Sequence, residues 1–330
     1  MKRFGIWILL ILLMLTTACS GIESKEDAKL KEVKLVLDWT PNTNHTGLYV
    51  ARDKGYFREQ GLDVQIIQPG ETGADQLVAS GKADFGIGYQ EGLTLARVEG
   101  MPLVSIAAII QHNTSCFASL KEKNIQRPRD FVGKKYGSFD SPTEKPIIET
   151  LMKLDGAPSQ NFRMVSVGNT DFFAASKRDI DFFWIYYGWT GIEAKLRGMD
   201  LNLIYLTDYS KELDYYTPII TTSEAKIQKD PKLVEAFMKA VSKGYQFAIQ
   251  HPEEAAEILI KAEPDLDPKL VRESQKWLSK QYQADAKVWG YQKKEVWANY
   301  ANWMKKHNLL KGNFDPEKAF TNRFLPGGEK

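Results

Sequence analysis

Short apolar runs alternate with amphipathic segments along the first two thirds of the chain. Strand-like runs at 33–37, 62–67, 83–88 and 103–110 are separated by helix-like segments at 45–54, 72–80 and 91–99. A second series follows Pro128, with strand-like runs at 135–139, 162–167, 181–186 and 201–206 and helix-like segments at 145–155, 171–177 and 189–197. Strands that alternate with helices predict mostly parallel sheets covered by helices on both faces. The pattern therefore predicts an α/β fold of two similar lobes.

From Ser223 onward the pattern is helical. Apolar residues recur three or four apart in 231–250, 251–261, 268–283 and 294–308, which is typical of helices with one buried face. We expect this tail to pack back on the first lobe, so that lobe 1 comprises 33–117 and 223–330 and lobe 2 comprises 118–222. Crossovers near 115–119 and 219–223 then form a hinge on which the two lobes close over a ligand.

The N-terminus has the pattern of a bacterial lipoprotein signal. Lys2 and Arg3 precede an apolar run at 6–15 and the sequence Thr-Thr-Ala-Cys-Ser-Gly, which ends on Cys19. The apolar run is shorter than the roughly 20 residues that span a bilayer. We therefore expect a signal peptide at 1–18, lipidation of Cys19 and a polar, flexible tether at 19–32. These features predict a protein that is lipid-anchored on the extracytoplasmic face of the cell membrane.

Composition narrows the choice of partners and chemistry. Removing Lys2 and Arg3 with the signal leaves 42 basic residues (44 − 2) against 42 acidic residues, so nothing suggests a nucleic-acid partner. Once Cys19 is acylated, Cys116 is the remaining cysteine, which excludes a disulfide within the chain and a cysteine-rich metal site. We expect a monomer without a metal or cofactor. Outside the cytoplasmic membrane, where soluble cofactors are scarce, binding is favoured over catalysis.

Ligands of open α/β sheets bind outside the carboxyl ends of the strands. Five segments are expected at that edge, namely 38–45, 70–74, 88–92, 137–143 and 186–193. In the first, Asp38, Asn42 and His45 are candidate ligand contacts, although the same residue types also satisfy turns and cap helices. Trp39 follows the first strand, where its ring is available either for stacking on a flat ligand or for the core.

The other four segments supply further candidates. Thr72 and Gly73 begin a helix whose free N–H groups suit an anionic or formyl oxygen, with a plain helix cap as the alternative reading. The remaining candidates are hydroxyl, carboxylate and aromatic side chains at strand ends or crossovers: Tyr89, Glu91, Ser115, Ser138, Tyr186, Tyr187, Trp189 and Glu193. Because neighbouring residues of a strand point to opposite faces, one of Tyr186 and Tyr187 is expected in the core.

Three motifs carry a resemblance to a known family. They are Asp-Trp-Thr-Pro-Asn-Thr-Asn-His at 38–45, Gly-Tyr-Phe followed by Gly-Leu-Asp within 55–63, and Ser-Gly-Lys-Ala-Asp-Phe-Gly at 80–86. Over about 33–303 the chain resembles the thiamine-pyrimidine-precursor binding proteins of bacterial ABC transporters. The middle motif is shared with sulfonate, nitrate and taurine binders, whereas the first is much more specific. The resemblance implies a two-lobed periplasmic-binding-protein-like fold of type II, an aminopyrimidine ligand and a membrane permease as partner.

The same superfamily includes the fungal pyrimidine synthases of thiamine biosynthesis. Those enzymes carry a lysine that holds pyridoxal phosphate, a histidine after it and a cysteine-rich stretch. At the corresponding places this chain has Gly88 and Gly92, and it has no cysteine run. Without that lysine no Schiff base forms, so an enzyme is disfavoured. A sensor or structural lipoprotein, and a binder of hydroxymethylpyrimidine, thiamine, a sulfonate or nitrate, stay open as alternatives.

The implied ligand is N-formyl-4-amino-5-aminomethyl-2-methylpyrimidine, a flat ring with an exocyclic amine. Such a ring needs aromatic faces, which Trp39 and one of Tyr186, Tyr187 or Trp189 are expected to provide. It also needs a carboxylate opposite its amine and ring nitrogen. Glu193 is the first choice for that role and Asp38 the second, while Asn42, His45, Tyr89 and Glu91 are further polar candidates.

Overall fold

The computed structural model describes residues 29–168 and 170–327. The expected signal peptide, Cys19 and most of the tether therefore lie outside the described residues. Lys31 and Glu32, which we expected in the tether, are the first two residues of strand β1 (Lys31–Val36), where they pair with Leu62 and Asp63. Within the described part of the chain, no helix combines the length and apolarity needed to cross a membrane.

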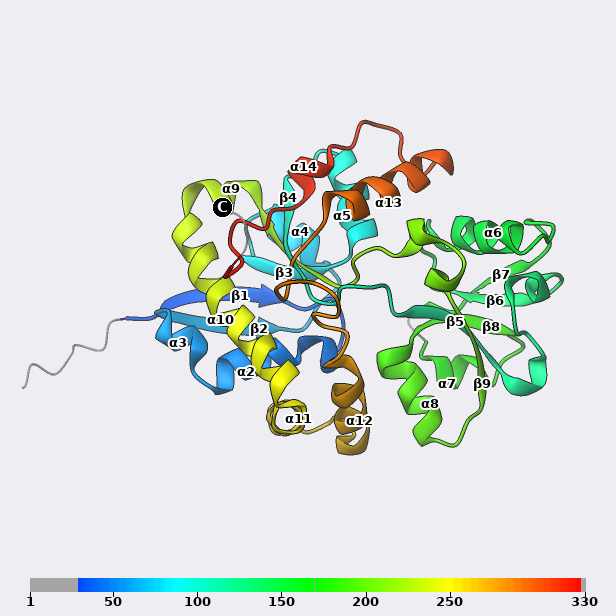
Figure 1. The fold of residues 1–330 in the computed structure, drawn as a ribbon, viewed down its shortest axis with the longest axis horizontal. Helices are drawn as coiled ribbons and strands as arrows, with labels where there is room; N and C mark the ends of the chain where they lie inside the picture. The colour runs from blue at the N-terminus through cyan, green and yellow to red at the C-terminus, as the bar shows by residue number, and fades with distance from the viewer. Residues whose placement is uncertain (1–28, 169, 328–330) are drawn as a thin grey trace, which may run out of the picture. The chain divides into compact units, whose positions relative to one another are not determined.

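Two five-stranded sheets form the centre of the fold (Figure 1). The first has the order β2-β1-β3-β10-β4, with β2 at Leu62–Ile67, β3 at Phe85–Gly88, β4 at Leu103–Ala108 and β10 at Ile219–Ser223. The second has the order β7-β6-β8-β5-β9, with β5 at Ser115–Leu120, β6 at Lys135–Ser138, β7 at Arg163–Ser166, β8 at Phe182–Tyr186 and β9 at Leu201–Tyr205. The two sheets repeat one topology, so the prediction of two similar α/β lobes is confirmed.

Each sheet is mixed because it contains one strand that arrives from the other lobe. β1 is parallel to β2 and β3, whereas β10 is antiparallel to β3 and β4. In the second sheet β6 is parallel to β7 and β8, whereas β5 is antiparallel to β8 and β9. β5 belongs wholly to the second sheet and β10 wholly to the first, so the chain changes lobes within 108–115 and 205–219. These crossovers come a few residues before the boundaries expected from the sequence.

Helices cover both sheets. In the first lobe they are α2 (Thr46–Asp53), α3 (Tyr56–Glu59), α4 (Ala74–Ala79), α5 (Gln90–Val98), α9 (Glu224–Lys229), α10 (Pro231–Gln250), α11 (Pro252–Ala262), α12 (Pro268–Leu278) and α14 (Pro316–Ala319). In the second they are α6 (Glu144–Leu154), α7 (Phe172–Ala175) and α8 (Ile192–Leu196). The long tail helices α10, α11 and α12 each begin with proline, which suits the first helical position because its missing N–H is not needed there.

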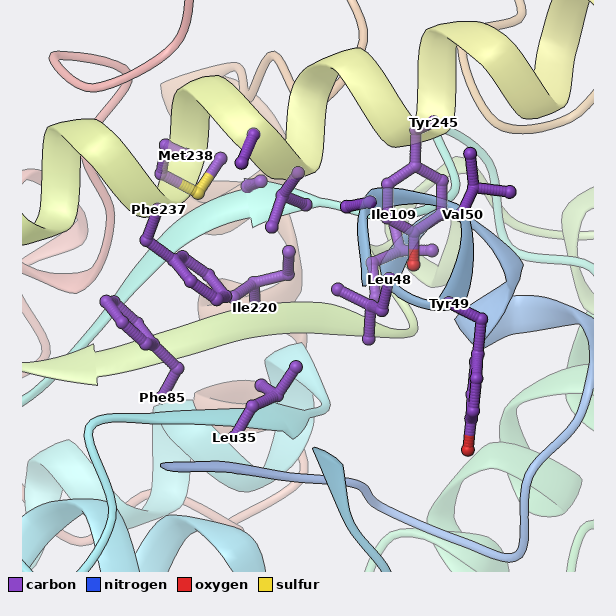
Figure 2. Packing of buried hydrophobic residues seen from close by; sticks show 14 of the residues in the cluster. Leu35, Leu48, Tyr49, Val50, Phe85, Ile109, Ile220, Phe237, Met238 and Tyr245 are labelled. Carbon is purple, nitrogen blue, oxygen red and sulfur yellow. The ribbon is translucent and has the colours of Figure 1, made fainter. Parts of the chain in front are cut away.

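Helix α10 provides the core of the first lobe. Its Phe237 ring stacks on Phe85 of β3 at 3.7 Å, beside Ile220 of β10 (Figure 2). At the other end of the helix, Gly244 lets α10 approach α2 closely, because a Cβ atom there would lie 2.1 Å from the carbonyl oxygen of Gly47. This packing holds α2, and with it the 38–45 loop, firmly against the sheet.

Helix α13 (Lys294–Lys306) departs from the expectation that the tail packs on the first lobe. Trp297 at its start belongs to an apolar cluster of the first lobe, but Tyr300 and Trp303 belong to the main cluster of the second. The Trp303 indole N–H donates to Thr150 Oγ1 of α6 over 3.3 Å. The expectation was wrong for this helix because its aromatic side chains pack into the apolar cluster of the second lobe, which also contains residues of α6.

Candidate functional site

Asp38 follows β1 and anchors a buried polar cluster. Its carboxylate accepts a hydrogen bond from His45 Nε2 at 2.7 Å and another from the Tyr89 hydroxyl at 2.7 Å. Burial by itself raises the pKa of a carboxyl group, but the interactions with His45 and the hydrogen bond from Tyr89 outweigh it and hold the pKa of Asp38 below its ordinary value. Asp38 is therefore an ionised carboxylate held in one orientation.

Asn42 and His45 organise the loop that carries Asp38. Asn42 caps the short 3-10 helix Thr43–His45, since its side-chain oxygen accepts the Asn44 N–H at 2.9 Å. The Asn42 N–H donates to His45 Nδ1 at 3.2 Å, so Nδ1 is the acceptor and Nε2 carries the hydrogen that Asp38 receives. Both ring nitrogens of His45 are thus engaged within the loop. Asn42 therefore caps the 3-10 helix, and His45 positions the Asp38 carboxylate.

Two more carboxylates lie at the same edge of the first sheet. Asp75, in the first turn of α4, accepts the Thr221 hydroxyl at 3.2 Å. Burial raises the pKa of Asp75 to about 6, against the effect of the Thr221 hydrogen bond and helped by the charge of Asp38. Glu91, in the first turn of α5, is half-buried, and its buried Oε2 atom has no hydrogen-bond partner among the described residues. Burial raises the pKa of Glu91 to about 8, against the effect of a hydrogen bond from its own backbone N–H and helped by the charge of Asp75.

Tyrosines from three other elements lie within the electrostatic influence of Glu91. Tyr186 ends β8 of the second sheet, and its hydroxyl lies 3.5 Å from Thr217 Oγ1 in the second crossover. Tyr215 of that crossover and Tyr300 of α13 are fully buried, with ring centroids 4.2 Å apart. Burial raises the pKa of all three hydroxyls, and the charge of Glu91 is the next contribution in each case. Side chains of both lobes therefore converge on one acidic centre.

The turn after β8 separates the two neighbouring tyrosines. It is a π-helical turn, Tyr187–Gly191. Tyr187 packs edge-on against Trp277 of α12 at 5.1 Å, and Trp189 packs against the main apolar cluster of the first lobe. Tyr186 is therefore the member of the pair that faces the acidic centre, and Tyr187 is the one that packs.

This turn also makes a polar contact between the lobes. The Ser274 hydroxyl of α12 donates to the carbonyl oxygen of Gly188 and lies 2.5 Å from Thr43 Oγ1. Ser274 and Thr43 are both fully buried. The loop that carries Asp38 and the turn that follows Tyr186 are thus linked through a single hydroxyl group.

Several other predicted residues are not brought into this cluster. Glu193 pairs with Arg197 along α8. The Ser115 hydroxyl donates to Asn113 at 2.6 Å, and the Ser138 hydroxyl donates to Glu144 at 2.5 Å. Thr72 is exposed, and Gly73 is the N-cap of α4. Trp39 lies beside Asp38 in the chain, with 49% of its surface exposed.

The structure also adds residues that the sequence did not single out. Asp75 follows the 70–74 segment directly. Its place in the first turn of a helix that follows a strand was a signal in the sequence that could have marked it as a site residue. Tyr215, Thr217 and Tyr300 reach the site only through tertiary packing, so no local pattern marks them. In the described residues, no group of three or more histidine, cysteine, aspartate or glutamate side chains is arranged to hold a metal ion.

Comparison with known proteins identifies the family. A family model described as NMT1/THI5 like matches residues 42–255. The chain belongs to the NMT1/THI5-like family. This membership confirms the resemblance that the 38–45 motif carries.

Individual relatives place the chain within the NMT1/THI5-like family. It is 29% identical to the formylaminopyrimidine-binding protein of Halalkalibacterium halodurans over 97% of this chain and 99% of that protein. It is 24% identical to a 4-amino-5-hydroxymethyl-2-methylpyrimidine phosphate synthase of Legionella pneumophila over 89% of this chain and 92% of that one. Among solved structures, the periplasmic aliphatic sulphonate binding protein SsuA of Escherichia coli superposes with a TM-score of 0.68 at 12% identity, covering 91% of this chain and 95% of that chain. That last likeness shows that the fold is that of periplasmic binding proteins.

Proposed function

We propose that this chain is the solute-binding lipoprotein of an ABC importer and captures N-formyl-4-amino-5-aminomethyl-2-methylpyrimidine between its two lobes. The observation that carries the proposal is the acidic centre formed by Asp38, Asp75 and Glu91, faced by Tyr186 from the other lobe. A relative that matches nearly the whole chain is named for binding formylaminopyrimidine. The bound pyrimidine would serve salvage into thiamine.

The charge of the site favours a ligand rich in hydrogen-bond donors. Three half-buried carboxyl groups, those of Asp38, Asp75 and Glu91, follow the carboxyl ends of the parallel strands β1, β2 and β3. An aminopyrimidine presents an amine and a ring nitrogen to such groups, whereas a sulfonate or nitrate would bring another negative charge to them. The acidic character of the site therefore disfavours a sulfonate or nitrate ligand, which is the principal alternative within this fold.

Trp39 and Tyr186 provide the aromatic faces in this proposal. Trp39 keeps 49% of its surface exposed although it adjoins the buried Asp38, and a half-exposed tryptophan at a strand end is available to stack on a flat ring. Stacking of a base on an aromatic side chain contributes about 1 to 3 kcal/mol. In place of Glu193, whose carboxylate pairs with Arg197, we assign the polar contacts to Asp38 and Glu91.

A synthase-like activity is the alternative that the family itself raises, and the packing around Gly88 disfavours it. A Cβ atom at Gly88 would lie 2.9 Å from Asp75 Oδ1. A lysine at that position would displace the Asp75 carboxylate, so the observed acidic centre requires glycine at position 88. We therefore propose binding rather than catalysis, by a monomer that Cys19 anchors outside the membrane and that delivers its ligand to a permease.

Thermal-shift measurements with a panel of compounds test this proposal. Formylaminopyrimidine should raise the melting temperature by mass action, with smaller shifts for hydroxymethylpyrimidine and thiamine and none for taurine or nitrate. Asp38→Asn should lose most of the shift, while Glu193→Gln serves as the matched control and should keep it. A shift with taurine alone would refute the pyrimidine assignment, and loss of the shift in Glu193→Gln would return the carboxylate role to Glu193.

A further inference from the structure

Glu91 differs from the other carboxylates of the site in having a buried oxygen atom without a partner among the described residues. Asp38 is held by His45 and Tyr89, and Asp75 by Thr221. Glu91 Oε2 is buried and accepts no hydrogen bond from any described residue. A buried polar atom left unpaired is costly, so this oxygen atom needs a partner that the protein itself does not supply.

The surroundings of Glu91 disfavour a negative charge. A hydrogen bond from its own backbone N–H favours the carboxylate, but burial outweighs it, and the charged group that acts on Glu91 is another carboxylate, Asp75 of α4. Tyr89 beside it in the chain, Tyr186 of β8, Tyr215 of the second crossover and Tyr300 of α13 interact with it as neutral hydroxyls. A carboxyl group that is desolvated, next to a like charge and without a cation is most stable when it is protonated.

A protonated carboxyl group presents a donor and an acceptor side by side, namely its O–H and its C=O. The edge of a neutral 4-aminopyrimidine presents the complement, a ring nitrogen that accepts and an adjacent amine that donates. We propose that Glu91 recognises the ligand as a neutral carboxylic acid, donating to the ring nitrogen and accepting from the amine, so that the protein selects the uncharged aminopyrimidine. This inference rests on the proposed function and deepens it.

Substitutions at Glu91 separate a neutral acid from a carboxylate. The Glu91→Gln side chain keeps one donor and one acceptor in the same places, so its calorimetric affinity for formylaminopyrimidine at pH 7 should stay within about threefold of that of the wild-type protein. Glu91→Met keeps the size but removes both groups, and its affinity should fall at least about tenfold. A tenfold loss in a folded Glu91→Gln protein, as judged by circular dichroism, would overturn the proposal, because it would show that a charge is required.

The pH dependence of binding supplies a second test. Wild-type affinity should be level between about pH 7 and pH 7.5 and should weaken by roughly tenfold per pH unit above pH 8, where Glu91 loses its proton. It should also weaken at acidic pH, where a protonated ring nitrogen can no longer accept from Glu91. Glu91→Gln should show no decline above pH 8. Wild-type affinity that rises above pH 8 would contradict the inference.

A measurement without ligand distinguishes this inference from the proposed function. In the free protein, the carboxyl carbon-13 resonance of Glu91, assigned with the Glu91→Gln variant, should titrate near pH 8. A midpoint near the ordinary value of 4.5 would overturn the inference whether or not the ligand binds. A midpoint near pH 8 in a protein that binds no aminopyrimidine at any pH would refute the proposed function, and the recognition of the ring by Glu91 with it.

Discussion

The contact made by Ser274 predicts how long the closed site holds its ligand. A serine hydroxyl has one hydrogen, and that hydrogen is donated to the carbonyl oxygen of Gly188 in the other lobe. The Thr43 hydroxyl must then be the donor to Ser274 Oγ across 2.5 Å. Ser274→Ala removes this link and leaves both the carbonyl oxygen and the Thr43 hydroxyl without their partner.

The magnitude follows from the burial of these groups. Ser274 and Thr43 are fully buried, and Gly188 packs against α12 so closely that a Cβ atom there would lie 2.9 Å from Trp277. Leaving one buried acceptor unsatisfied costs about 1 to 3 kcal/mol. When the lobes separate, water can reach the Gly188 carbonyl group, so the cost falls on the closed state. The affinity should therefore drop by about 5- to 150-fold.

Stopped-flow fluorescence with a competing ligand measures this effect directly. Most of the loss should appear as faster dissociation, because mutations at an existing contact act mainly on the off-rate. Ser279→Ala is the matched control, since Ser279 closes the same helix but donates to Lys276 within it at 3.1 Å. An unchanged dissociation rate in a folded Ser274→Ala protein would refute the idea that this contact holds the lobes together.

Three further predictions concern the ring clamp, pH and the lipid anchor. Trp39→Ala should weaken ligand binding by about 1 to 3 kcal/mol in calorimetry and leave the melting temperature unchanged, because half of the side chain is exposed; wild-type affinity would place Trp39 outside the site. The raised pKa values of Asp75 and Glu91, about 6 and about 8, mean that the folded protein holds protons which the unfolded chain releases. Stability against urea should therefore fall as the pH rises from about 4 to 8, less steeply in Glu91→Gln, and equal slopes would contradict the assignment. Replacing Cys19 by alanine should leave an uncleaved or released protein when membrane and soluble fractions are blotted, whereas membrane retention of a correctly processed form would contradict lipidation.

Much of the fold was predictable because the segments are strongly periodic. The apolar pattern placed 62–67 and 231–250 where β2 and α10 lie. An apolar run does not reveal which sheet it joins. The predicted crossovers between the lobes therefore lie a few residues later in the chain than the observed ones, which precede β5 and β10. Helix α13 was assigned to the wrong neighbour for a similar reason, because periodicity identifies a buried face but not the surface that buries it.

The site was predictable only where chemistry and strand ends coincide in the sequence. Asp38, Tyr89 and Glu91 each follow a parallel strand, and the structure brings them to one edge. Glu193 was preferred from its position one turn after an aromatic run, although Arg197, four residues further along the same predicted helix, was the sequence signal for its ion pair. Tyr215 and Tyr300 meet near Glu91 from distant parts of the chain, and only tertiary packing shows that they belong there.

Calorimetric titration of the purified protein with formylaminopyrimidine at pH 7 measures whether the chain binds an aminopyrimidine at all. We expect one site per chain with micromolar or tighter affinity, no heat with taurine or nitrate, and a large loss of affinity in Asp38→Asn. The absence of binding to every aminopyrimidine tested, together with saturable binding of a sulfonate, would contradict the proposed function.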